Sequence, residues 1–271
     1  MATQSTPTLA KLALGALISR IRESNAISQA EAAAELGVHI ETYRRWETGK
    51  FAPKPMAIRA LADAIGATAQ EMSRMSTLSL ESKQRGLFEG ANVPPDLRAL
   101  YETEATARLI ESLELEYIPG LLQTPEYHIA AQAAQIPIDE EHAATLRALR
   151  MRRQQFVFSR DPLPRLRFLI GQAALLYLDA HPEVRDGQVA RLREAAAMPG
   201  VDVRVITGFH AAMLGTFTIL TPPSTAGAKP FVYVEDIDGG RYVEGDVVSR
   251  YRTVFEAVLD RQSEELEKYL R

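Results

Sequence analysis

The chain has 271 residues, of which 46% are hydrophobic and 24% are charged, and it contains no cysteine. This composition is typical of a protein with a sizeable core, and the absence of cysteine excludes disulfide bonds, thiolate metal sites and cysteine nucleophiles. Its 31 Lys and Arg residues against 35 Asp and Glu residues give a formal net charge of −4, which argues against bulk attraction to nucleic acid.

The spacing of apolar residues predicts five short helices in the first part of the chain, beginning near Leu12 and then covering 29–36, 39–47, 53–66 and 68–80. Ser28 and Glu31 have the spacing of a capping box at the start of the second helix, and Gly37 is suited to end it. We therefore expect an all-α domain of five helices over residues 10–80.

Residues 81–94 are polar, contain glycine and end in two prolines, so they are predicted to be a linker. Beyond it the pattern predicts helices over 96–115, 138–158, 183–197 and 246–271, a helix start at Thr124-Pro125, and strands over 165–170, 201–206, 216–221, 231–235 and 241–244. Two strands on either side of a helix indicate a β–α–β crossover. The chain is thus expected to be multidomain, with a mixed α/β (α+β) domain over 95–271.

The charge changes sign between these parts. Residues 1–88 hold 11 Lys and Arg against 8 Asp and Glu, a net +3, whereas residues 89–271 hold 20 against 27, a net −7. Such an asymmetry indicates that the two parts have different partners. The apolar run over 12–18 is too short to span a membrane and no cleavage site follows it, so we expect a soluble cytoplasmic protein without membrane contact.

The most informative segment is SQAEAAAELGVHIETYRRWETGK, residues 28–50. Ala33 is small where two helices would cross closely, and Gly37 tolerates the positive φ of a turn. Tyr43 and Trp46 lie at inner apolar positions of the following helix, and we interpret them as core residues and not as contacts to a ligand. This set predicts a helix-turn-helix motif.

From Leu14 to Met72, including the ending RRWETGKFAPKPMAIRALADAIGA, the sequence resembles the lambda-repressor-like, or xenobiotic-response-element, family of regulators. The resemblance implies that the second helix of the motif enters the major groove of DNA. By position, its base-reading residues are His39, Ile40, Glu41, Thr42, Arg44 and Arg45.

Chemistry suggests roles for some of these residues. Arg45 is suited to bidentate contact with guanine, Glu41 can accept from cytosine N4, and Ile40 can pack on a thymine methyl group. The resemblance also implies that Ser28, Gln29, Lys50 and Lys54 contact phosphates, and that Glu47 forms a structural ion pair with Arg22.

The second part of the chain resembles the C-terminal domain of the WhiJ-like, antitoxin-type regulators of actinobacteria. The resemblance is carried by YIPGLLQTPEY at 117–127, by the run from Arg150 to Gln154, and by the strand sequences between Phe217 and Glu244. It implies a regulator whose activity is set by a small protein encoded by a neighbouring gene.

Seven arginines lie between Arg147 and Arg167, opposed within that stretch only by Asp161. They can bind an acidic partner, a phosphorylated ligand or DNA, or they can pair with acidic residues of their own domain, which the −7 charge favours. The candidate partner or effector surface consists of Arg150, Arg153, Phe209 and His210.

No catalytic motif is present in the sequence. The five histidines lack metal-ligand spacing, and the sequence contains neither a nucleophile elbow nor a phosphate-binding or dinucleotide-binding loop. We therefore predict no catalytic residues, no metal and no cofactor, and a protein that is not an enzyme.

Together these features predict a sequence-specific, antitoxin-like transcriptional regulator that binds a double-stranded operator as a homodimer, is associated with the nucleoid when bound, and binds a small partner protein or effector through its C-terminal domain. Two alternatives stay open. One is a repressor that senses a small molecule, and the other is an enzyme domain that the helix-turn-helix directs to DNA.

Overall fold

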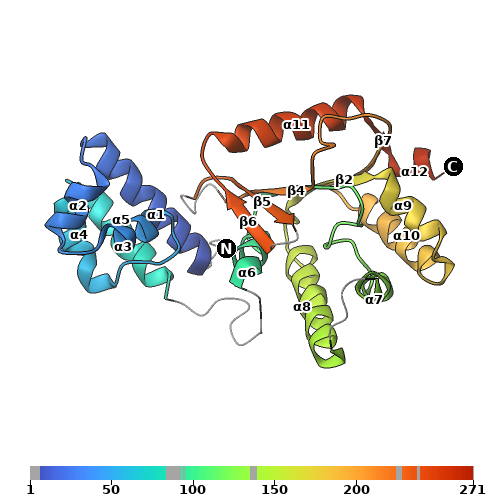
Figure 1. Ribbon diagram of the computed structural model, residues 1–271, viewed down its shortest axis with the longest axis horizontal. Coiled ribbons are helices and arrows are strands. Elements are labelled where there is room, and N and C mark those ends of the chain that lie inside the picture. The colour runs from blue at the N-terminus through green and yellow to red at the C-terminus, as the bar shows by residue number, and fades with distance from the viewer. Residues whose placement is uncertain are drawn as a thin grey trace. The chain divides into compact units, whose positions relative to one another are not determined.

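The computed structural model describes residues 7–83, 93, 95–134, 139–223, 228–236 and 239–270 (Figure 1). The chain divides into two compact units. The first, called here the helical unit, takes in residues 1–90 and 222–229, and the second, the α/β unit, takes in 91–221 and 230–271. Most of the predicted linker 81–94 lies outside the described residues, although its first residue ends a helix.

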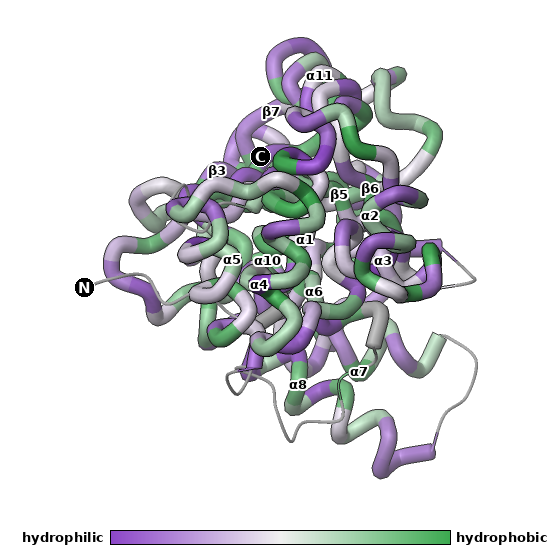
Figure 2. Tube along the Cα trace, turned by 90° about the vertical axis from the view of Figure 1, so that its left-hand side faces the viewer, coloured by the Kyte–Doolittle hydropathy of each residue, from purple (hydrophilic) through white to green (hydrophobic). Residues whose placement is uncertain are grey.

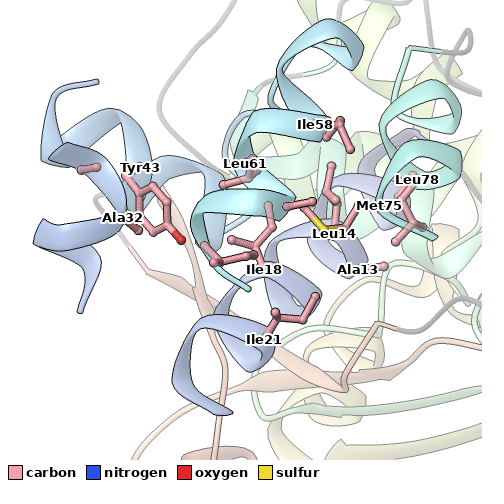
Figure 3. Close-up of a cluster of buried hydrophobic side chains, with 14 residues drawn as sticks. Ala13, Leu14, Ile18, Ile21, Ala32, Tyr43, Ile58, Leu61, Met75 and Leu78 are labelled. Atoms are coloured by element: carbon pink, nitrogen blue, oxygen red, sulfur yellow. The ribbon is translucent and has the colours of Figure 1, made fainter. Parts of the chain in front are cut away.

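The helical unit contains α1 (Pro7–Ser24), α2 (Gln29–Glu35), α3 (Ile40–Glu47), a 3₁₀ turn η1 (Pro55–Ala57), α4 (Ile58–Ala64) and α5 (Ala69–Glu81). Both α2 and α5 begin with complete capping boxes, Ser28 with Glu31 and Thr68 with Glu71. Apolar residues from all five helices form one buried core (Figure 3). The predicted five-helix helix-turn-helix domain is confirmed, except that its fourth helix starts as a 3₁₀ turn.

Two glycines let α1 approach α3 at backbone distance. A Cβ atom on Gly15 would lie 2.4 Å from the carbonyl oxygen of Glu47 and 2.6 Å from that of Trp46. Gly49, which follows α3, has a φ of +67°, and a Cβ there would lie 2.8 Å from the Cα of Leu12. The end of α3 is therefore held directly against the backbone of α1.

The α/β unit is built on a seven-stranded mixed sheet. Its strands are β1 (Leu109–Glu114), β2 (Arg165–Gly171), β3 (Val201–Ile206), β4 (Phe217–Thr221), β5 (Phe231–Asp236), β6 (Gly239–Val243) and β7 (Ser263–Glu265), in the spatial order β6-β5-β4-β1-β2-β3-β7. The β1–β2 and β2–β3 pairs are parallel, and the other pairs are antiparallel. The predicted crossover between β2 and β3 is confirmed, with α9 (Gln172–Asp179) and α10 (Pro182–Ala196) between them.

Helices cover both faces of this sheet (Figure 1). On one face α11 (Val247–Arg261) packs its apolar side, which includes Phe255 and Val258, against strand residues such as Leu113 and Leu169. Figure 2 shows hydrophilic and hydrophobic residues alternating along α11. The other face carries α6 (Pro95–Glu104), α7 (Pro125–Ala133), α8 (Glu140–Phe158), α9 and α10. The short α12 (Leu266–Tyr269) follows β7.

The interface between α11 and the sheet contains a partly buried ion network, in which Arg167 and Glu111 are buried. Arg167 on β2 donates to Glu111 on β1 at 2.9 Å and to both carboxylate oxygens of Glu256 on α11 at 2.6 Å. Arg252 donates to the second oxygen of Glu111 at 3.2 Å, and the Arg167 guanidinium lies 5.1 Å from the ring centre of Phe255. Because removing one member of a buried pair leaves an uncompensated charge, this network couples the helix to two central strands.

The single helix predicted over 96–115 is wrong, because the chain there forms α6 and then β1. In the structure β1 lies in the middle of the sheet, and Glu111 is fully buried with arginine partners from β2 and α11. The carboxylate of Glu111 is thus paired inside the α/β unit.

The continuous helix predicted over 246–271 is also wrong. It ends at Arg261, and Ser263–Glu265 pairs antiparallel with β3 before α12 begins. The backbone N–H and C=O groups at the edge of β3 form hydrogen bonds with β7. A longer helix would leave these groups without a strand partner. The sequence Asp238-Gly239-Gly240 is typical of a hairpin turn. Residue 238 lies outside the described residues, whereas Gly239 and Gly240 belong to β6, which pairs antiparallel with β5.

Replacement of Gly15 by alanine is expected to lower the free energy of unfolding by about 1–3 kcal/mol, because the new methyl group meets backbone carbonyls that cannot rotate away. Urea denaturation measures the change. The control is Gly187→Ala on α10, where nothing lies within 4 Å of the added Cβ. That variant should gain up to about 1 kcal/mol of helix propensity. Equal effects at both positions would contradict the close α1–α3 contact.

Candidate nucleic-acid interface

Two residues form the turn and the start of α3. Gly37 has a φ of +62°, which a residue without Cβ adopts without strain. His39 then caps α3, since its Nδ1 accepts a hydrogen bond from the backbone N–H of Glu41 at 3.2 Å. The short turn between α2 and α3 therefore has the chemistry that a helix-turn-helix requires.

One face of α3 is buried. Tyr43 is fully buried and lies beside Ala32 in Figure 3. Its ring centre is 6.1 Å from that of Trp46, which packs against the same core. Burial raises the pKa of the Tyr43 hydroxyl above its usual range, so the group is a neutral part of the core.

The opposite face of α3 is polar and exposed. Five of the six predicted base-reading residues have exposed side chains, namely His39, Glu41, Thr42, Arg44 and Arg45. Ile40 differs, because it is partly buried and packs against the core of the helical unit. A contact between Ile40 and a thymine methyl group stays a prediction, and less of this side chain is available than the sequence suggested.

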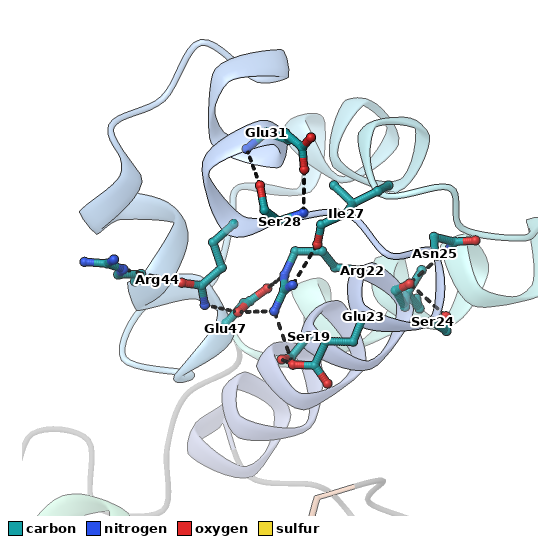
Figure 4. A network of polar contacts seen from close by, with 12 residues as sticks. Ser19, Arg22, Glu23, Ser24, Asn25, Ile27, Ser28, Glu31, Arg44 and Glu47 are labelled. Atoms are coloured by element: carbon teal, nitrogen blue, oxygen red, sulfur yellow. Dashed lines mark hydrogen bonds and ion pairs between the residues drawn. The ribbon is translucent and has the colours of Figure 1, made fainter.

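A buried ion pair fixes α3 to α1 (Figure 4). Arg22 Nε lies 2.5 Å from Glu47 Oε1, and its Nη2 lies 3.2 Å from Oε2, so the contact is bidentate. The two side chains are only 10% and 5% exposed. Arg22 also donates to the backbone carbonyl of Ile27 at 2.8 Å, and its hydrogen bond to Glu47 raises the pKa of the guanidinium. This single arginine joins α1, α3 and the segment that leads into α2.

The ion pair is connected to the exposed face through Gln29. The Gln29 amide donates to Glu47 Oε2 at 2.5 Å and accepts from Arg44 Nε at 3.4 Å, and Arg44 also donates to Glu41 at 2.6 Å. Sequence spacing placed Gln29 at the start of α2 but did not reveal this connection, which depends on how α2 packs beside α3. The predicted contact of Gln29 with a phosphate can therefore use only the amide N–H that does not donate to Glu47.

Ser28 is the N-cap of α2. Its hydroxyl accepts from the backbone N–H of Glu31 at 3.1 Å, and the Glu31 carboxylate accepts from the backbone N–H of Ser28 at 2.8 Å. These hydrogen bonds from Ser28 lower the pKa of Glu31. The Ser28 side chain is thus engaged with Glu31, and its contact with a phosphate stays a prediction.

The loop after α3 presents cations beside the exposed face. Lys50 and Lys54, the predicted phosphate contacts, both have exposed side chains. Phe51 is 53% exposed, and the guanidinium carbon of Arg45 lies 5.9 Å from the centre of its ring. Sequence reasoning missed Phe51, for which the only signal was an aromatic residue among the basic residues of this loop. The ring lies within cation–π range of the leading base-reading candidate.

The four residues of the predicted partner or effector surface in the α/β unit differ widely in exposure. Arg153 was wrongly placed there, because it is buried, pairs with Glu104 and lies 4.7 Å from the ring centre of Tyr101. Arg150 is partly buried on the same helix. By contrast, Phe209 is 89% exposed, and His210 beside it is partly buried, which lowers the pKa of its imidazole.

Both units match models of known protein families. Residues 13–75 match the model of a helix-turn-helix domain, which supports DNA binding by the helical unit. Residues 97–265 match the model described as a domain of unknown function, DUF5753, and this match covers more than half of the chain. The chain belongs to the DUF5753 family. No curated protein and no solved structure matches it significantly.

Two further properties concern the described residues of this DUF5753 protein. They contain no group of three or more His, Asp or Glu residues arranged to hold a metal ion. None of the helices described has both the length and the apolar character needed to cross a membrane.

Replacing Glu47 by glutamine is expected to lower the free energy of unfolding by about 3–5 kcal/mol, because it leaves the Arg22 guanidinium buried without its counter-charge. The double variant Arg22→Met with Glu47→Leu removes both charges and should lose much less. Urea denaturation of the three proteins measures these differences.

The control for this experiment is Glu41→Gln, which breaks the exposed pair between Glu41 and Arg44, with side chains 53% and 52% exposed. Its cost should stay below about 1 kcal/mol, since exposed pairs contribute little. If Glu47→Gln and Glu41→Gln were equally mild, the buried pair would not be what holds α3 in place.

Proposed function

We propose that the protein is a sequence-specific transcriptional regulator of the lambda-repressor-like type, in which α3 enters the major groove of an operator. One observation carries the proposal: Arg44 and Arg45 are exposed in the last turn of α3, and the buried pair of Arg22 and Glu47 fixes this same end of the helix. Base readout requires side chains presented on a rigid element, because a misplaced donor loses its hydrogen bond to the base edge.

The roles divide between base edges and phosphates. Arg45 is the residue proposed to bind guanine, with Phe51 orienting its guanidinium. Arg44 is already engaged by Glu41 and Gln29, so it would have to exchange partners on DNA or stay as a support for the helix. Lys50 and Lys54 are proposed to contact the phosphate backbone, which fixes the register of α3 on the duplex.

The operator-bound form is proposed to be a homodimer. A single helix-turn-helix domain contacts about one half-site, so specificity normally requires two domains on a two-fold symmetric operator. The whole chain has a net charge of −4. Its affinity for DNA therefore has to come mainly from a few specific contacts and from the two-fold symmetry of the dimer, and less from electrostatic attraction between the whole chain and DNA. Such a protein would act in the bacterial cytoplasm, where its operator lies.

The α/β unit is proposed to bind a regulator and not to catalyse a reaction. Its resemblance to the WhiJ-like, antitoxin-type proteins favours a small protein encoded by a neighbouring gene. The segment between β3 and β4 supports a protein contact, because Phe209, Met213 and Leu214 are 89%, 56% and 101% exposed. Exposed apolar residues this close together are typical of interaction surfaces.

Arg45→Ala is expected to relax operator specificity at one base position, with a loss of about 1–3 kcal/mol of binding free energy on the preferred sequence. The operator is first selected from random duplexes by the full-length protein, and affinities are then measured by fluorescence anisotropy on every single-base variant. Failure to select any sequence would contradict the proposed function. Unchanged affinities in Arg45→Ala would show that α3 does not read DNA through this residue.

Lys54→Ala is expected to weaken binding to all duplexes alike and to lower the slope of log affinity against log salt by about one, because one fewer counterion is released. The matched control is Lys268→Ala on α12, which removes the same charge from an exposed position of the α/β unit. An unchanged slope in Lys54→Ala, or an equal change in Lys268→Ala, would remove Lys54 from the interface.

A further inference from the structure

Two arginines on α8, Arg150 and Arg153, have very different environments although they lie on the same side of the helix. Arg153 makes a bidentate ion pair with Glu104, with 2.6 Å between Nη2 and Oε1. Arg150 makes no hydrogen bond to any described residue, and its Nε is buried without an acceptor. The guanidinium of Arg150 therefore lacks the carboxylate partner that the guanidinium of Arg153 has.

Arg150 is the exception among the inward-facing members of the arginine run. Arg160 donates to the backbone carbonyl of Ala107 at 2.6 Å, and Arg167 is held by Glu111 and Glu256. Burying a guanidinium is costly unless acceptors inside the protein replace the lost water. The three other inward-facing arginines meet this requirement within the α/β unit, and Arg150 does not.

The loop after β1 holds the Arg150 guanidinium in place. A Cβ atom on Gly120 would lie 2.3 Å from Arg150 Nη1, so the guanidinium packs directly on the backbone of this glycine. Gln154, also on α8, donates to the carbonyl oxygens of Gly120 and Gln123 at 2.9 and 2.8 Å. This loop leaves the carboxyl end of β1, in the middle of the sheet, and ligands of α/β sheets bind at that end of the strands.

Two titratable side chains lie within range of the Arg150 charge. Glu114 ends β1, and burial together with the nearby Glu235 raises its pKa to about 8, against the opposing influence of Arg153 and Arg150. Its carboxyl group is thus mostly protonated at neutral pH and can donate a hydrogen bond. His128 on α7 is buried, its Nε2 has no hydrogen-bond partner, and burial followed by the charge of Arg150 lowers its pKa to about 4.

Neither Glu114 nor Arg150 is closed off from solvent. Both keep part of their surface accessible, although burial is the largest influence on the pKa of each. Burial and the charge of Arg153 lower the pKa of Arg150 although Tyr101, Glu235 and Glu104 act in the opposite direction, so its charge is not fully compensated within the α/β unit. A small molecule entering there would meet a cation without a hydrogen-bonded acceptor, a protonated carboxyl group and a neutral imidazole.

We propose that Arg150, Glu114 and His128 form a binding site for a small molecule that carries a carboxylate or phosphate group. The guanidinium of Arg150 supplies the charge and two or more donors, and Glu114 donates through its carboxyl proton. Arg153, already paired with Glu104, is a positioning residue that keeps α8 in place. The role of this molecule as an effector of transcription rests on the proposed function, whereas its binding does not.

The test follows the Nε–Hε signal of Arg150 in nitrogen-15 NMR spectra of the full-length protein, assigned with the variant Arg150→Lys. Inorganic phosphate and sodium acetate are titrated separately, with sodium chloride keeping the ionic strength constant. We expect phosphate or acetate to shift the Arg150 signal in a saturable way. The anion that shifts the signal shows whether the ligand carries a phosphate or a carboxylate group. The matched control is the signal of Arg193 on α10, whose Nε donates to Glu267 at 2.7 Å and which should not move.

An Arg150 signal that neither anion moves, or that moves no more than the Arg193 signal, overturns the site. Because the measurement is made on the unmodified chain, a folding defect in Arg150→Lys affects only the assignment, which triple-resonance spectra also provide. Operator binding is measured on the same sample. A fixed Arg150 signal in a protein that still binds its operator overturns the ligand site alone, and a saturable shift in a protein that selects no operator overturns the proposed function alone.

Discussion

A charge that leaves water has to meet an opposite charge, and this constraint organises both units of the protein. In the helical unit Arg22 pairs with Glu47, and in the α/β unit Arg153 pairs with Glu104 and Arg167 with Glu111. Each pair joins elements that are distant in the sequence. Because losing one partner leaves the other charge buried and uncompensated, each pair tolerates few arrangements of the elements it connects.

Hydrogen bonds connect the buried pair of Arg22 and Glu47 to the proposed DNA-binding face. Glu47 binds Arg22 on its inner side and Gln29 on its outer side, and Gln29 in turn contacts Arg44 on the exposed face of α3. The geometry of the exposed arginines is thus set from the interior of the helical unit. This explains how a chain with a net charge of −4 can present a defined basic surface, since placement and not total charge decides base recognition.

Local features were predictable from the sequence, whereas partners were not. The capping box of Ser28 and Glu31, the turn at Gly37 and the inner position of Tyr43 depend on neighbours within a few residues, and the structure has all three. The arginine run between residues 147 and 167 looked uniform in the sequence. Only the folded α/β unit distinguishes Arg153, which has a carboxylate partner, from Arg150, which has none.

The sequence alone determined the two-part organisation, the helix-turn-helix and, except for Ile40, the residues of α3 that point outward, because helical periodicity and caps are short-range properties. The tertiary structure decided that 109–114 is a central strand, that the last helix stops at Arg261, and that Gln29 links Glu47 to Arg44. These outcomes depend on sheet neighbours and charge partners far away along the chain. A one-dimensional pattern contains no information about which of several distant arginines will meet a given buried carboxylate.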